Sequence, residues 1–156
     1  MLSGFLISNI CALLFLYFLL RLAAKFMSTE NAVNAAVLYI VFPTSLFLSA
    51  IYAESMFLAA IVAAFLFIEE RKLWFAVIAC AIAVLTRPQG ALALPALAWL
   101  AWIRFERSRI ISTAVIIAAV CIPLAGYLMY IDQTFGSMSW ISQSQTYWRE
   151  IGRAHV

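Results

Sequence analysis

The sequence predicts an all-α, polytopic integral membrane protein with about six transmembrane helices. Hydrophobic residues make up 67% of the 156 residues, and charged residues only 11%. Soluble domains carry about 25% charged residues. Apolar runs of about 20 residues, the length that crosses a bilayer, recur along the whole chain. No stretch has the composition of a soluble domain, so we expect one helical unit over residues 1–149.

The first predicted span covers residues 2–22, and basic residues mark its end, Arg21 within it and Lys25 just after it. Its start has no charged n-region and no small-residue cleavage motif. We therefore interpret it as a retained span rather than a signal peptide.

The second predicted span covers residues 32–49 and follows a polar link. Ser28 or Thr29 in that link is suited to cap the helix, because its hydroxyl can accept a hydrogen bond from a free N–H group. The span contains Pro43, which lacks a backbone donor and should bend or end the helix there.

The third to fifth apolar runs are shorter than a full crossing requires. They hold about 13 to 15 strongly apolar residues, against roughly 20 for a span. Irregular backbone at membrane depth is tolerated only beside protein or a water-filled cavity. We therefore expect an outward-facing cavity near residues 52–55 and 86–90. The last four predicted spans cover residues 54–68, 73–85, 91–103 and 110–131.

The formal charge of +3 is unevenly distributed and sets the predicted orientation. Before the last seven residues, the outward loops carry only Arg87 and Arg149, whereas alternate loops carry seven basic residues. By the positive-inside rule those seven face the cytoplasm. We expect a multi-pass protein of the plasma membrane in a prokaryote, or of the endoplasmic reticulum in a eukaryote, with no nucleic-acid partner. The seven are Arg21, Lys25, Arg71, Lys72, Arg104, Arg107 and Arg109.

The cysteines and the histidine offer no metal site. Cys11, Cys80 and Cys121 lie inside apolar runs without CxxC spacing, so we expect buried packing residues. The last seven residues, EIGRAHV, match the in-frame translation of a common short-read sequencing adapter. We interpret residues 150–156, with His155, as a non-native tail, which makes the chain a fragment of a longer reading frame. The alternative is a genuine short tail.

Two opposite charges interrupt the apolar sequence where two helices should meet. Glu54 begins the third run and Arg87 ends the fourth, so antiparallel packing would bring them to the same level. An ion pair would offset part of the cost of placing each charge in the membrane. On the functional interpretation, the planar guanidinium binds phosphate, and the carboxylate orients it or binds a sugar hydroxyl or a metal ion. The alternative is a pair that only fixes helix register.

The segments around this pair are polar and irregular. Pro88 biases Arg87 away from helical geometry, and Gly90 permits a sharp turn or a close backbone approach. Asp132 is the other acidic residue on the outward side before the last seven residues. It could either cap a span or take part in catalysis. Residues 104–109 have the composition of a solvated cytoplasmic link. Four polar residues share the two segments of the pair and are candidates to line a site: Tyr52, Ser55, Thr86 and Gln89.

The stretch FPTSLFLSAIYAESMFL, followed by AVLTRPQGAL, resembles the PIG-V-type mannosyltransferases. The resemblance covers residues 30–100, and RPQG is more similar to the prokaryotic members than to the eukaryotic RSNG form. The family elements are Pro-x-Ser, Tyr-x-Glu-Ser and Ala-x-x-Thr-Arg. They correspond here to Pro43 with Ser45, Tyr52 with Glu54 and Ser55, and Ala83 with Thr86 and Arg87.

This resemblance implies a GT-C glycosyltransferase fold that transfers mannose from a polyprenyl-phosphate-mannose donor on the outer or lumenal face. Arg87 would contact the donor phosphate, with Tyr52, Glu54, Ser55, Thr86 and Gln89 lining the site. The implied partners are the bilayer, the lipid-linked donor and an acceptor, without a further cofactor; whether a divalent metal takes part is left open. The family is inverting, and its catalytic base is an Asp in an outward loop upstream of this chain's first span. We therefore expect the fragment alone to be inactive.

Two other functions compete with this interpretation. Short, broken hydrophobic segments and buried charges also mark the substrate sites of secondary transporters. A transporter of that kind predicts an internal repeat, and none is evident between the two halves. A structural membrane subunit, in which Glu54 and Arg87 only hold helices together, is the other alternative.

Overall fold

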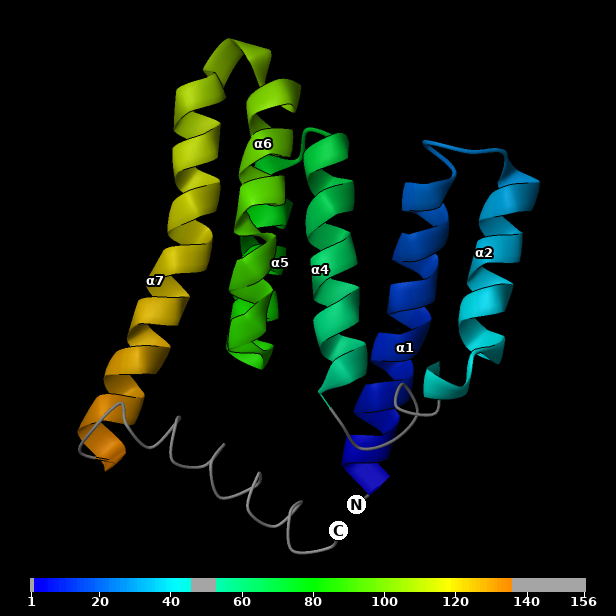
Figure 1. The fold of residues 1–156 in the computed structure, drawn as a ribbon, viewed down its shortest axis with the longest axis horizontal. Coiled ribbons are helices and arrows are strands. Elements are labelled where there is room, and N and C mark those ends of the chain that lie inside the picture. Colours follow the sequence, from blue (N-terminus) through cyan, green and yellow to red (C-terminus); the bar gives the residue numbers. More distant parts are fainter. Residues whose placement is uncertain (1, 46–52, 136–156) are drawn as a thin grey trace, which may run out of the picture.

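The computed structural model describes residues 2–45 and 53–135, and all of the regular structure in these ranges is helical (Figure 1). The predicted all-α class is confirmed. The α-helices are α1 (Leu2–Ala23), α2 (Thr29–Val41), α4 (Glu54–Glu69), α5 (Leu73–Thr86), α6 (Leu94–Arg104) and α7 (Arg109–Phe135). Short 3-10 helices are η1 (Pro43–Ser45), η2 (Pro88–Ala93) and η3 (Glu106–Ser108).

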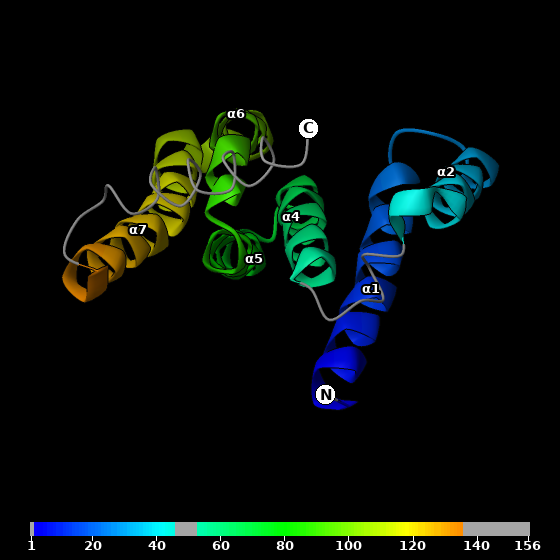
Figure 2. The ribbon, with the colours of Figure 1, turned by 60° about the horizontal axis from the view of Figure 1, so that its bottom comes forward.

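The α-helices stand side by side and alternate in direction (Figure 1). Helices α4 and α5 form the centre, with α1 against α4, and α7 against both α5 and α6. Helix α2 packs on α1 at the outer side (Figure 2). Because successive helices reverse, the start of α4 and the end of α5 share one edge.

The helix limits follow the local signals in the sequence. The Ser28 Oγ accepts a hydrogen bond from the Asn31 amide at 3.4 Å, so the predicted cap is confirmed. Helix α2 ends at Val41, just before Pro43, as predicted for a proline that removes a donor. The chain then forms the single turn η1.

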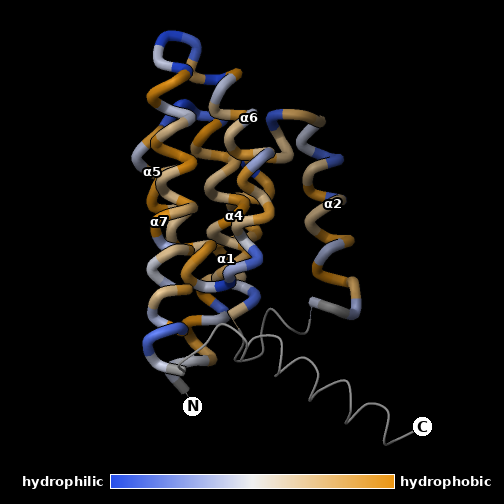
Figure 3. The backbone as a smooth tube through the Cα atoms, turned by 60° about the vertical axis from the view of Figure 1, so that its left-hand side comes forward, coloured by the Kyte–Doolittle hydropathy of each residue, from blue (hydrophilic) through white to orange (hydrophobic). Residues whose placement is uncertain are grey.

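Small residues let the central helices approach closely. The main core lies between α4, α5, α6 and α7, and includes buried Ala64, Ala76 and Ala101 beside Leu97 and Ile116. Alanine at such contacts is typical of helices that pack within a membrane. Hydrophobic residues cover most of each helix, and hydrophilic ones gather in the upper loops and near the lower helix ends (Figure 3).

The cysteine prediction is right for one residue and wrong for another. Cys80 is buried in the core, and Cys11 is partly buried. Cys121 is exposed, because it lies on a face of α7 that no other described helix covers. An apolar run therefore predicts a helix, but it does not predict which face of that helix is packed.

Two helical segments in the described residues are long and apolar enough to cross a membrane, Ser3–Ala23 and Glu106–Thr134. Helix α5 is apolar but has only 14 residues. At 1.5 Å per residue it rises roughly 21 Å, less than the ~30 Å hydrocarbon core. The short central runs are therefore confirmed as short helices, while the six-span arrangement stays a prediction.

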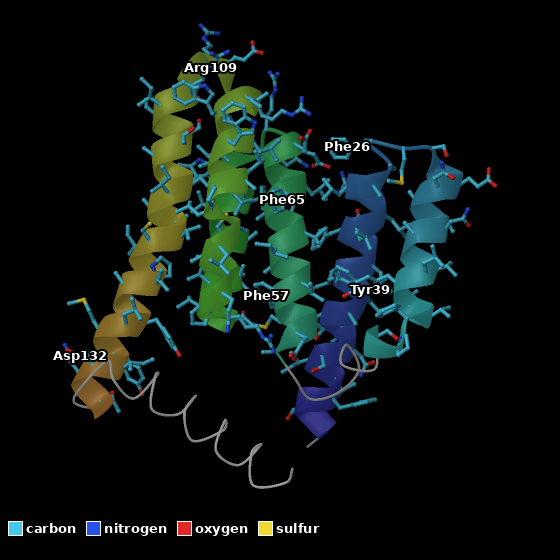
Figure 4. The ribbon with its side chains drawn as sticks, viewed as in Figure 1. Phe26, Tyr39, Phe57, Phe65, Arg109 and Asp132 are labelled. Atoms are coloured by element: carbon cyan, nitrogen blue, oxygen red, sulfur yellow. The ribbon has the colours of Figure 1, made fainter. Side chains whose placement is uncertain are left out.

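All seven basic residues predicted to face one side lie at the edge where α1, α4 and α6 end (Figure 4 labels Arg109 there). Three ion pairs form at this edge; two of them join different helices, and the Lys72–Glu70 pair lies within the turn between α4 and α5. Arg21 and Lys72 pair with Glu70 at 2.5 and 2.7 Å, and Arg104 pairs with Glu69 at 2.7 Å. The prediction of a solvated link is therefore wrong for Arg104, which holds α6 against α4.

These ion pairs make stability depend on pH. The hydrogen bond from Lys72, with the nearby charge of Arg21, lowers the pKa of Glu70 below its usual value of 4.5. A lowered folded-state pKa stabilises the protein above the unfolded pKa, and this contribution is lost as pH falls through the folded value. We expect Glu70→Gln to lower the unfolding temperature in detergent at pH 7, and the difference from the parent to shrink below about pH 4. An equal difference at pH 7 and pH 3 would show that Glu70 acts by packing alone.

The turn between α4 and α5 places a non-glycine residue in the left-handed region. The Lys72 amide donates to the Phe67 carbonyl at 2.8 Å and the Arg71 amide to Ile68 at 3.0 Å, which is a Schellman motif. Arg71 occupies its left-handed position with φ of 57°. Glycine adopts this conformation without the steric cost that a side chain incurs.

We therefore expect Arg71→Gly to raise the free energy of unfolding by about 0.5–1 kcal/mol. Glycine removes the steric cost of the left-handed conformation, and the greater entropy of the unfolded chain offsets part of this gain. Thermal unfolding in detergent measures the change. Lys72→Gly is the comparison variant: Lys72 has a φ of −97° and gains nothing from glycine, and it also loses its ion pair with Glu70, so this variant should be less stable than the parent. Stabilisation by both variants, or by neither, would contradict the explanation.

Candidate functional site

The candidate site lies at the edge opposite the basic residues, where α4 begins and α5 ends. Glu54 is the first residue of α4, and Arg87 follows the last residue of α5. The Arg87 Nη2 donates a hydrogen bond to the Glu54 Oε1. The Arg87 side chain is 38% exposed and that of Glu54 is 26% exposed. The predicted ion pair is confirmed, and it is open to the surroundings on one side.

The end of α5 gives Arg87 its position. Its backbone is extended, with φ of −147° and ψ of 120°, as predicted for a residue before proline. The Arg87 amide still donates to the Ala83 carbonyl at 3.0 Å, and the Arg87 carbonyl accepts from the Gly90 amide at 2.8 Å. The arginine is therefore fixed between the last turn of α5 and the first turn of η2.

Gly90 allows η2 to fold tightly against α5. It is buried, and a Cβ atom there would lie 3.1 Å from the Ala83 carbonyl oxygen and 3.2 Å from the Phe57 ring. The predicted close backbone approach is confirmed. Phe57 stands on α4 at this same edge (Figure 4), so Gly90 is the point where three segments of the site meet.

The helix dipoles favour both charges of the pair. Glu54 lies in the first turn of α4, whose free N–H groups carry partial positive charge, and Arg87 lies at the partly negative end of α5. The N-cap of α4, Ala53, supplies no side-chain hydrogen bond. The amides of this first turn can therefore attract an anion that approaches Arg87.

Two buried polar atoms in the first turn of α4 have no hydrogen-bond partner in the described part of the chain. They are the Glu54 Oε2 and the Ser55 Oγ. Ser55 is completely buried. Buried polar groups are normally hydrogen-bonded, so these atoms mark a position that a polar ligand group can satisfy.

The other predicted site residues have different surroundings. The Thr86 hydroxyl donates to the Ile82 carbonyl at 2.6 Å, which leaves only its acceptor positions for a ligand. Gln89 is exposed beside Arg87 on η2. Asp132 is exposed near the far end of α7 (Figure 4). Tyr52 lies outside the described residues, as does part of the wall of the predicted outward cavity.

An apolar cleft that the sequence did not predict runs along α1, α4 and α5. Its volume is about 390 Å³. It extends from Met56 and Ile82, near the ion pair, to Phe67 and Phe75, near the basic edge. Its floor is made by small residues, Ala59, Ala60, Ala63 and Ala79. That alanine spacing on α4 was the only sequence signal for the cleft.

No protein family, no curated protein and no solved structure matches this chain.

Proposed function

We propose that this chain is the donor-binding part of a multi-pass membrane mannosyltransferase that uses polyprenyl-phosphate mannose. The observation that supports the proposal most is the half-open Glu54–Arg87 pair with unpartnered polar atoms beside it. The resemblance of residues 30–100 to the PIG-V-type mannosyltransferases suggests that the sugar of the donor is mannose and that its carrier is a polyprenyl phosphate.

Arg87 is suited to hold the donor phosphate. A guanidinium has five N–H donors, and the hydrogen bond to Glu54 uses one of them. Its planar fork matches two phosphate oxygens, and its exposed fraction of 38% leaves room for them. In this proposal Glu54 keeps the fork in one orientation, and its second oxygen accepts a hydrogen bond from a sugar hydroxyl.

The cleft along α1, α4 and α5 is suited to the lipid tail of the same donor. It is lined almost entirely by apolar side chains and starts two residues from Glu54, at Met56. A polyprenyl chain in this cleft would keep its phosphate at Arg87. The two features then recognise the two chemically distinct parts of one molecule.

The distribution of charge supports the membrane orientation. Seven basic residues lie at one edge, and the pair at the opposite edge includes Arg87. The positive-inside rule then assigns the basic edge to the cytoplasm. In the proposed arrangement six helices insert in the membrane, and sugar transfer takes place on the outer or lumenal side.

The proposed reaction inverts the configuration at the sugar. The acceptor hydroxyl oxygen forms a bond to C1 of mannose, the bond from C1 to the phosphate oxygen breaks, and a base takes the hydroxyl proton. Arg87 stabilises the charge that develops on the leaving phosphate. None of the residues described here is assigned as the base, and we propose an upstream Asp for that role.

A donor-binding measurement tests this function. We expect the purified chain in detergent to bind polyprenyl-phosphate mannose at least about 100-fold more tightly than the neutral polyprenol of equal length, because the neutral lipid forgoes two charged hydrogen bonds to Arg87. A nucleotide-linked mannose, which lacks the lipid tail, should compete poorly. Equal affinity for the phosphorylated and neutral lipids would contradict the proposed phosphate site.

A further inference from the structure

A second cleft opens at the basic edge, between α1, α4 and α6. Its volume is about 400 Å³, within the range of small-molecule sites. Apolar and aromatic side chains form most of its wall, and Phe26 and Trp99 are 65% and 68% exposed. Phe26 and Phe65 mark its two sides at the upper edge (Figure 4).

One end of this cleft carries an incompletely satisfied ion pair. Glu69 and Arg104 line the cleft and are joined by a 2.7 Å ion pair through the Glu69 Oε2. The Glu69 side chain is only 6% exposed. Its Oε1 and the Arg104 Nε are both buried without a partner in the described residues. One anionic acceptor and one cationic donor therefore remain at the end of an apolar cleft.

These two atoms require a ligand with complementary charges. A group that satisfies both must present a cationic N–H donor to Glu69 and an anionic acceptor to Arg104. Because the protein groups sum to zero charge, a zwitterion fits better than an anion. A phosphoethanolamine head group has this chemistry. A phosphocholine group has no N–H donor, and a phosphoglycerol group has no cation.

We propose that this cleft binds one molecule of phosphatidylethanolamine. The ammonium donates to Glu69, the phosphate accepts from Arg104, and an acyl chain covers Phe65, Leu100 and Trp99. The Arg104 side chain is 38% exposed, so the head group can approach the ion pair from that side. This inference depends on the proposed membrane orientation but not on the transferase activity.

The level of the cleft agrees with a head-group site. Glu69 and Arg104 are the last residues of α4 and α6, so they lie at the helix ends, together with the basic residues. Trp99 lies on α6 between them and the membrane centre, and tryptophan is enriched at that depth. The lipid therefore belongs to the cytoplasmic leaflet in the proposed orientation.

Quenching of Trp99 fluorescence by lipids with brominated acyl chains tests the inference. The full chain is placed in phosphatidylcholine vesicles that contain increasing fractions of brominated phosphatidylethanolamine, phosphatidylcholine or phosphatidylglycerol. The fluorescence of Trp99 is obtained by subtracting the emission of the Trp99→Phe variant from that of the parent. We expect half-maximal quenching by phosphatidylethanolamine at about a tenfold lower mole fraction than by phosphatidylcholine, as for one charged hydrogen bond.

Three variants separate the site from the surrounding lipid. Glu69→Gln should remove the preference, because it removes the charge that holds the ammonium. Glu106→Gln is the matched control: it removes an exposed acid at the same edge, outside this cleft, and should keep the preference. If Glu69→Gln fails to fold, Ala96→Leu fills the cleft, keeps both charges and should reduce quenching by phosphatidylethanolamine to the level of phosphatidylcholine.

Three results would overturn the inference. Equal quenching by phosphatidylethanolamine and phosphatidylcholine would show ordinary surrounding lipid. Strongest quenching by phosphatidylglycerol would show that the whole basic edge attracts anions. Protection of Trp99 from all three lipids would show that protein, such as a second copy of the chain, fills the cleft.

Discussion

Replacing Arg87 by alanine is expected to weaken the binding of polyprenyl-phosphate mannose by about 100-fold. The variant removes the guanidinium that faces the phosphate, and two charged hydrogen bonds of about 1.4 kcal/mol each account for this factor. Stability should change much less. Because both side chains of the pair are partly exposed, its loss should cost about 1 kcal/mol of unfolding free energy. Lipid titration and thermal unfolding of the same purified variant give the two values.

Two control variants refine this prediction. Arg87→Lys keeps the charge but loses the planar fork, so we expect a loss of about tenfold. Arg107→Ala removes an exposed basic residue at the opposite edge and should leave affinity unchanged. If Arg107→Ala weakens binding as much as Arg87→Ala, the effect is a general loss of positive charge, and the site assignment is wrong.

Replacing Gly90 by valine is expected to lower the free energy of unfolding by about 3 kcal/mol, at the upper end of overpacking costs. The added Cβ atom alone would lie 3.1 Å from a backbone oxygen, and two more methyl groups have to fit beside Phe57. The 2.8 Å hydrogen bond from the Gly90 amide to the Arg87 carbonyl would shift with the turn. Donor binding should therefore fall as well.

Gly126→Ala is the matched control for this prediction. Gly126 lies in α7, and nothing lies within 4 Å of the position of its Cβ atom. Alanine there should be neutral or should stabilise the helix by up to about 1 kcal/mol. Chemical denaturation in mixed micelles gives both values. A Gly90→Val variant as stable as the parent would show that η2 can move away from α5 without cost.

The local sequence predicted the order of the helices and most of their limits, although the second span, predicted over residues 32–49, is helix α2 only to Val41. Pro43 ends α2, Ser28 caps its start, and Pro88 turns Arg87 out of α5, because each acts through its own backbone atoms. The Glu54–Arg87 pair was predictable because two successive helices must reverse direction. These features depend on neighbours in the chain or on a single turn.

Features that depend on lateral packing were not predictable. The clefts and the pairing of Arg104 with Glu69 depend on which faces of α1, α4 and α6 meet. The exposure of Cys121 has the same cause. In a uniformly apolar chain, the periodicity of hydrophobic residues says little about which face of a helix packs against other helices, since lipid-exposed and buried positions are both hydrophobic. Only the small residues of α4 indicated where a partner or a ligand could approach.

The site was predicted in part. Glu54 and Arg87 come together as expected, while the hydroxyl proton of Thr86 is committed to the backbone of its own helix. A threonine near a helix end often bonds to a carbonyl one turn earlier, so this outcome was available from local rules. The apolar cleft beside the pair adds a lipid-tail site that no polar motif could have indicated.

The double variant Glu54→Gln/Arg87→Gln tests most directly whether the ion pair binds the donor. Its affinity for polyprenyl-phosphate mannose is measured together with its stability. Neutralising both partners leaves no unpaired charge, so we expect the free energy of unfolding to stay within about 1 kcal/mol of the parent. We predict that the preference for the phosphorylated lipid over the neutral polyprenol disappears. A double variant that keeps this preference at unchanged stability would show that the pair does not bind the donor phosphate, and would contradict the proposed donor site.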